Sequence, residues 1–102
     1  MELVQRIDGD VVVLSVSGEV TFKGGGSGRP LTDAVQSALE AGHIHFVVDL
    51  GGVTYVDSMG IGQLVQALAA VRKRGGVMRL TNLTRRVTEI LALTNLLTVF
   101  ND

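Results

Sequence analysis

The chain has 102 residues, which suits one domain over residues 1–102 and leaves little room for a second. Apolar residues make up 46% of it, but only three Phe and one Tyr contribute rings, so we expect a core of aliphatic side chains. A formal net charge of −1 argues against nucleic acid as a partner, and the absence of cysteine excludes disulfides, cysteine-ligated zinc and thiol catalysis.

The first part of the chain predicts a hairpin followed by a glycine-rich loop. Residues 1–6 lack the basic and apolar regions of a signal peptide, and no stretch approaches the roughly 18 apolar residues of a membrane-spanning helix. Residues 3–7 and 11–17 are strand-like, and the turn signal at residues 8–10 predicts that they pair antiparallel. Residues 24–28 hold four glycines in five positions, which predicts a loop, either a mobile connector or an engineered linker.

A helix, a buried strand and a second helix are predicted for the middle of the chain. Pro30 opens a stripe of apolar residues at helical spacing, and Gly42 fits the position just past its end. Residues 43–50 become nearly continuously apolar, which predicts a strand buried on both faces, and residues 51–57 are predicted to form a loop. The second helix begins near Ser58. Its predicted inward stripe is Ile61, Leu64, Val65, Leu68 and Val71.

The last part of the chain predicts one more strand and one more helix. Residues 77–81 read as a strand, and Thr84 is placed to cap a helix that ends at Asn95. Residues 96–100 are expected to pack on the core as a tail or a short edge strand. The predicted fold class is therefore α/β, with a mixed four- to five-stranded sheet and helices packed against it.

Ser58 lies where the helix begins, and this position is compatible with two roles. Its hydroxyl would cap free N–H groups of the first turn, an ordinary structural role that stabilises a helix by about 1 kcal/mol and that position alone favours. The same N–H groups and the positive end of the helix dipole also accommodate a phosphate. A phosphoserine would add about −1.5 to −2 charge beside Asp57 and repel a partner that fits the neutral surface.

Catalytic, nucleotide and metal sites are weakly supported. A nucleophile elbow around Ser58 would need a glycine where Val56 stands. His43 and His45 are predicted at the opposite end of the strand, as a solvated strand start with no third metal ligand nearby. Residues 60–62 give only the first part of a dinucleotide-binding GxGxxG pattern. We therefore expect no catalytic residue, no cofactor and no metal.

The order of these segments resembles the STAS domains of bacterial anti-sigma factor antagonists. The most specific part is Asp-Ser-x-Gly-x-Gly at residues 57–62, and the match covers nearly the whole chain in register. The segments that carry it are residues 18–20, 46–50, 53–64, 74–83 and 94–100.

The resemblance implies a STAS-like fold and a regulatory mechanism. The unphosphorylated protein would bind an anti-sigma factor that is also a serine kinase, releasing a sigma factor for transcription. The kinase would use its own ATP to phosphorylate Ser58 and end the interaction, and a serine phosphatase would reset it. The protein would be cytoplasmic, a monomer or weak dimer, and without membrane contact. The partner-binding residues implied are Thr21, Phe22, Asp57, Ser58, Met59, Gly60, Ile61 and Gln63.

Two features depart from the family pattern. The family commonly has an acidic residue where this chain has Thr21, and residues 24–28 differ from the usual lead-in to the helix. The resemblance also leaves an alternative, a scaffold or transporter-associated STAS domain in which Ser58 is only a helix cap.

Overall fold

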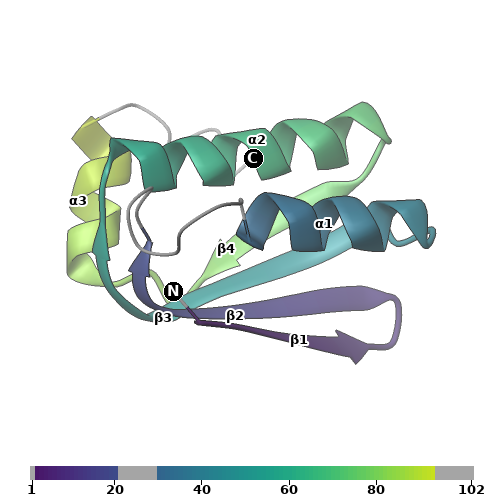
Figure 1. The fold of residues 1–102 in the computed structure, drawn as a ribbon, viewed down its shortest axis with the longest axis horizontal. Coiled ribbons are helices and arrows are strands. Elements are labelled where there is room, and N and C mark those ends of the chain that lie inside the picture. Colours follow the sequence, from purple (N-terminus) through teal and green to yellow (C-terminus); the bar gives the residue numbers. More distant parts are fainter. Residues whose placement is uncertain (1, 21–29, 94–102) are drawn as a thin grey trace.

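The computed structural model describes residues 2–20 and 30–93 of the chain (Figure 1). The predicted tail over residues 96–100 and the glycine-rich loop over residues 24–28 lie outside this part. The elements in chain order are β1 (Glu2–Asp8), β2 (Val11–Val20), α1 (Pro30–Glu40), β3 (His45–Val56), α2 (Ser58–Lys73), β4 (Val77–Thr81) and α3 (Arg85–Leu93).

The described strands form one four-stranded sheet in the order β1-β2-β3-β4. β1 pairs antiparallel with β2, as the turn signal predicts, and α1 and α2 connect the parallel strands β2, β3 and β4. Parallel neighbours need such crossovers, and helices meet that need while covering the sheet. The predicted α/β class and mixed sheet are confirmed.

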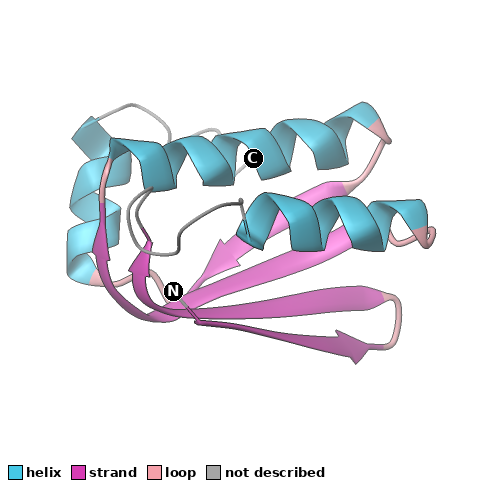
Figure 2. Ribbon diagram, in the orientation of Figure 1, coloured by secondary structure: helices cyan, strands magenta, loops and turns pink. Residues whose placement is uncertain are grey.

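The core lies between the sheet and the helices α1 and α2, which run side by side over one face (Figures 1 and 2). Alternate residues of β3, including Phe46 and Val48, are buried beneath them. Val47 and Asp49 point to the other face and are only half-buried. The prediction that this strand is buried on both faces is therefore wrong, because the described helices form a second layer on one side only.

β3 is longer than its sequence predicts. The predicted loop over residues 51–57 is mostly strand, which continues through two glycines to Val56. Two irregularities in the register with β2 each place one extra residue on β3, so the strand bends without ending. The bend requires glycine at position 52, because a Cβ there would lie only 2.8 Å from the Cβ of Ser17 on β2. The Gly51 N–H donates to Oδ1 of Asp49 at 2.9 Å, which satisfies it beside the bend.

The helix ends follow the predicted signals. Gly42 has a φ of +98° just past α1, and the neighbouring His43 N–H donates to the Ala38 carbonyl at 3.0 Å, a common way to close a helix. Thr84 caps α3, because its Oγ1 accepts from the Val87 N–H at 3.2 Å. Asn95, the predicted end of that helix, lies outside the described residues.

The inward face of α2 differs from the prediction at one position. Ile61, Leu64, Leu68 and Val71 are buried as predicted, but Val65 is 37% exposed. The buried face is completed by residues on the opposite flank of the stripe, Gly60, Gln63 and Ala67.

None of the helices within residues 2–20 and 30–93 is long and apolar enough to cross a membrane.

Candidate functional site

The candidate site lies where β3 passes into α2, beside the end of β2. The parallel strands β2 and β3 end at Val20 and Val56, which are register partners, so both carboxyl ends meet at the same edge of the sheet. Asp57 follows at once, and its N–H donates to the Val20 carbonyl at 3.4 Å. The start of α2 is thereby held against the end of β2, although the two are far apart in sequence.

Asp57 is the N-cap of α2. It has the extended backbone of a cap residue, with φ −109° and ψ −177°, and its Oδ1 accepts from the Gly60 N–H at 2.8 Å. Its own carbonyl accepts the first helical hydrogen bond, from the Ile61 N–H at 2.9 Å. The prediction that Ser58 is the helix cap is therefore wrong by one residue. The cap is Asp57, and Ser58 is the first residue of α2.

Gly60 lets α2 begin in close contact with the sheet. A Cβ at this position would overlap the Val20 carbonyl oxygen and lie 2.9 Å from Cγ2 of Val56. For Gly62, one residue beyond Ile61, no atom of the described residues lies within 4 Å of the same hypothetical Cβ. The two glycines of the motif thus differ in role. The first is required by packing, and the second is in open space on the helix surface.

The other predicted partner-binding residues fall into three groups. Thr21 and Phe22 lie outside the described residues. Ser58 and Met59 are placed by their backbone in the first turn of α2, directly after the cap. Ile61 and Gln63 are buried, 5% and 9% exposed. These last two side chains face inward in this structure, and contact between them and a partner stays a prediction.

Gln63 is a buried residue of α2 whose backbone carbonyl lies beside α1. The Thr32 hydroxyl of α1 donates to the Gln63 carbonyl at a long 3.5 Å. Within the described part of the chain, the side-chain Oε1 of Gln63 accepts no hydrogen bond, which is uncommon for a buried polar atom. Gln63 therefore contributes to how α1 and α2 pack beneath the site.

An exposed aromatic–cation pair lies near the same edge, and sequence reasoning missed it. Tyr55 is 41% exposed near the end of β3, and the Arg86 guanidinium of α3 lies 5.5 Å from its ring centroid. Such contacts are attractive, and Tyr and Arg are enriched at binding surfaces. The sequence places Tyr55 in a predicted loop and Arg86 in the helix predicted after Thr84, so no local signal joins them.

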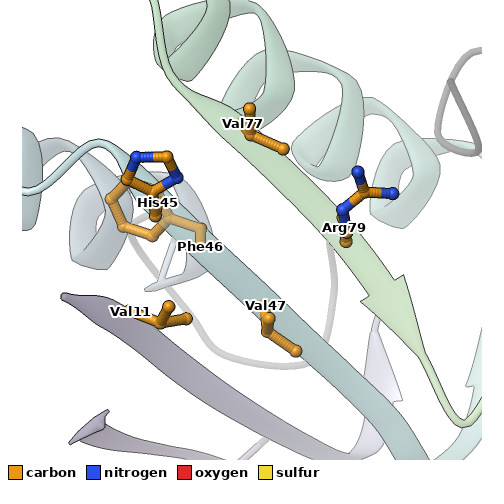
Figure 3. Close-up of a pocket in the computed structure, with 6 residues that line it drawn as sticks. All are labelled: Val11, His45, Phe46, Val47, Val77 and Arg79. Atoms are coloured by element: carbon orange, nitrogen blue, oxygen red, sulfur yellow. The ribbon is translucent and has the colours of Figure 1, made fainter. Parts of the chain in front are cut away.

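The histidines lie at the far end of β3 from Ser58. His45 is the first residue of β3 and Ser58 follows its last residue, Val56, by two positions, so the length of the 12-residue strand separates them. A Ser58–His pair is therefore not formed. His45 borders a hollow of about 100 Å³ with Val47 and Arg79 on the sheet face away from α1 and α2 (Figure 3). Across residues 2–20 and 30–93, no three His, Asp or Glu side chains are grouped to hold a metal ion.

Comparisons with solved structures show the same fold. An anti-sigma factor antagonist from Mycobacterium paratuberculosis is 24% identical, with 97% of this chain and 81% of that chain covered and a TM-score of 0.77. The phosphorylated form of SpoIIAA, a Bacillus cell fate determinant, is 14% identical (95% and 86% covered, TM-score 0.74). A sulfate transporter family protein from Wolinella succinogenes is 16% identical (93% and 75% covered, TM-score 0.70).

The sequence itself matches a family model. No curated protein is similar enough in sequence to count as a match. The family model described as "Mlab, STAS domain" matches residues 3–100, which include every described element from β2 to α3 and the Asp57–Gly62 motif. The chain therefore belongs to the STAS domain family.

Proposed function

We propose that this protein is an anti-sigma factor antagonist whose partner is an anti-sigma factor with serine kinase activity. In its unphosphorylated form it binds that partner in the cytoplasm and releases a sigma factor. Phosphorylation of Ser58 ends the binding, and a serine phosphatase restores it. The chain acts as ligand and substrate, with no catalytic residue, cofactor or metal of its own.

The observation that carries the proposal is the position of Ser58 in a fixed helix start. The preceding Asp57 caps the helix, and Gly60 is packed against the end of β2. Since Asp57 caps the Gly60 N–H, the helix does not depend on the Ser58 hydroxyl for its N-cap. The serine can then be modified without loss of the cap, and the helix dipole at its first turn favours the added negative charge.

Charge explains why the modification would release a partner. A phosphate at Ser58 lies next in sequence to the Asp57 carboxylate, so up to about three negative charges gather at one helix start. A partner that packs on the neutral surface would have to desolvate these charges or meet them with like charge. Both effects weaken binding. SpoIIAA, a Bacillus anti-sigma factor antagonist of the same fold, exists in unphosphorylated and phosphorylated forms, which supports the proposal.

The test uses candidate anti-sigma factor kinases encoded in the same genome. With ATP, one of them is expected to add a single phosphate that mass spectrometry maps to Ser58, and Ser58→Ala is expected to abolish it. Calorimetry then compares Ser58→Asp with the matched neutral variant Ser58→Asn. Asp should weaken binding at least about tenfold, roughly 1.4 kcal/mol, while Asn stays near the wild-type affinity.

Phosphate on another residue, or equal binding by the Asp and Asn variants, would contradict the switch. A control substitution at Ser37, on α1, should change neither phosphorylation nor binding.

A second candidate function is a transporter-associated STAS domain, in which Ser58 does not cycle. The structural likeness to the sulfate transporter family protein from Wolinella succinogenes supports this second candidate. In that case the protein would copurify with membrane transport subunits, and Ser58→Asp would leave this association unchanged. Co-purification from membranes and from the soluble fraction, with wild type and Ser58→Asp, separates the two functions.

A further inference from the structure

The outer edge of β1 is open to pairing with another strand. Within residues 2–20 and 30–93, β1 pairs with β2 on one side only, and Figure 1 shows it at the rim of the sheet with no helix beyond it. Its seven residues pair with β2 in continuous register without a bulge, and they include neither Lys nor Pro. Charged side chains also discourage pairing at sheet edges, and β1 has three of them, Glu2, Arg6 and Asp8, so another strand can pair with it only in a register that matches their charges.

The exposed side chains of β1 alternate in sign around an apolar centre. Glu2, Val4 and Arg6 share the face away from α1 and α2, because their partners on β2 alternate with the buried Leu14 and Val16. Val4 is 65% exposed, the largest exposed fraction among the large apolar side chains of the described residues. Glu2 and Arg6 stand two positions to either side of it. The strand is thus complementary to a second copy of itself run in the opposite direction.

Only one antiparallel register makes use of this symmetry. Directly opposite residues of an antiparallel pair point to the same face of the sheet. A register that opposes even-numbered to odd-numbered residues would therefore turn the helix-covered faces of the two copies to opposite sides, and the two sheets would not join into one. Pairing centred on Gln5 would oppose Glu2 to Asp8 of the second copy, and pairing centred on Arg6 would oppose two arginines. Like charges directly opposite each other are destabilising.

Pairing centred on Val4 opposes Val4 to itself and Glu2 to Arg6 twice. Directly opposite side chains have Cβ atoms about 4.5–5.5 Å apart, within reach of an ion pair. A register centred on Leu3 would pair fewer of the described residues and would leave Arg6 without an acidic partner.

We propose that two copies of this chain associate through β1, antiparallel and in register at Val4, to form one continuous sheet with four strands from each copy. The pairing uses five residues from each strand, Glu2 to Arg6. An interface this short lies at the small end of specific interfaces, so the dimer is weak and forms as the concentration approaches about 0.1–1 mM.

The test exploits the two crossed ion pairs. Glu2→Lys places a lysine opposite Arg6, and Arg6→Glu places a second glutamate opposite Glu2, so each variant alone should sediment as a monomer at concentrations where wild type dimerises. When the two variants are mixed in equal amounts, the introduced lysine faces the introduced glutamate, and Arg6 of one variant faces Glu2 of the other. Sedimentation equilibrium should then show a 1:1 complex of at least the wild-type affinity that weakens with added salt.

Val4→Lys provides an independent variant at the centre of the pairing, and since Val4 is largely exposed the fold should tolerate it. It should abolish dimerisation, and circular dichroism should show an unchanged fold. Wild type that remains monomeric at 1 mM, or a dimer that is unaffected by the single variants or not recovered in the mixture, would overturn the proposal.

Discussion

The two glycines of the site motif give the sharpest test of how α2 is held against the sheet. An added methyl group at Gly60 would overlap the Val20 carbonyl oxygen and lie 2.9 Å from both the Val20 carbonyl carbon and Val56 Cγ2. Two of these three atoms are backbone, so they cannot rotate away as a side chain does. The same change at Gly62 meets no atom within 4 Å in the part of the chain that the structure describes.

The expected magnitudes follow from these contacts. In a helix interior, Gly→Ala gains up to about 1 kcal/mol of intrinsic propensity. At Gly62 this gain should appear nearly undiminished, at about 0.5–1 kcal/mol. At Gly60 it is opposed by overpacking, which typically destabilises by about 1–3 kcal/mol and more where backbone must shift. We expect Gly60→Ala to lower the free energy of unfolding by about 2 kcal/mol, or about 3 kcal/mol relative to Gly62→Ala.

Urea unfolding of wild type and both variants measures the difference directly, provided that the slope with denaturant stays the same. A shift of about 2 kcal/mol corresponds to roughly 10 °C in Tm for a domain of this size. Since Gly60 fixes the start of α2, Gly60→Ala should also slow phosphorylation of Ser58, while Gly62→Ala should not. If the two variants unfold within about 0.5 kcal/mol of each other, the close contact between α2 and Val20 is wrong.

Other contacts predict smaller or differently located effects. Asp57→Ala should destabilise by about 1 kcal/mol in urea unfolding while Asp57→Asn, which can still cap, loses much less; equal losses would argue against the cap. Thr84→Ala should likewise lose about 1 kcal/mol and Thr84→Ser little, and hydrogen exchange should show the loss first in α3. Gly52→Ala should destabilise by about 1–3 kcal/mol through its contact with Ser17, and Ser17→Gly in the same chain should recover part of the loss; no recovery would place the strain elsewhere. Leu91→Ala, at a fully buried position of α3, should lower the free energy of unfolding by about 2–5 kcal/mol in the same assay.

The elements that sequence predicts well are those whose signals are local. The stripe of apolar residues in α1 and the cap at Thr84 each depend on residues within one or two helical turns, and the structure confirms both. β4 matches its predicted bounds, because a glycine pair and a loop enclose a short strand-like segment. In each case the physics that decides the structure acts over a short stretch of chain.

β3 shows what local signals cannot supply. Two consecutive glycines predict a loop at residues 51–57 because glycine is unfavourable in an isolated strand. Here the glycines allow the strand to bend along β2, and the contact that requires Gly52 comes from Ser17, 35 positions earlier in the chain. Neither the bulges nor this contact has a sequence signature of its own, so the extension appears only once β2 is in place.

The site is partly predictable for the same reason. The helix start near Ser58 is a local feature, and so is the presence of a cap. The rotation of α2 about its own axis, relative to the sheet, decides which residue caps the helix and which way the following side chains face. Ile61 is expected from sequence both on the inward stripe and at the partner surface, and the structure shows its side chain buried in the core. Tyr55 and Arg86 meet across two elements, so their contact has no signal in either segment.

The Val20 carbonyl links these observations. It accepts the Asp57 N–H, and its oxygen occupies the space that only glycine at position 60 leaves open. The end of β2 and the start of α2 are therefore a single packed unit, and the predicted partner-binding residues Thr21 and Phe22 come next in the chain after that carbonyl. A change that displaces the helix start must also displace the end of β2. We conclude that the end of β2 and the helix start that holds Ser58 are connected through one backbone group, the Val20 carbonyl.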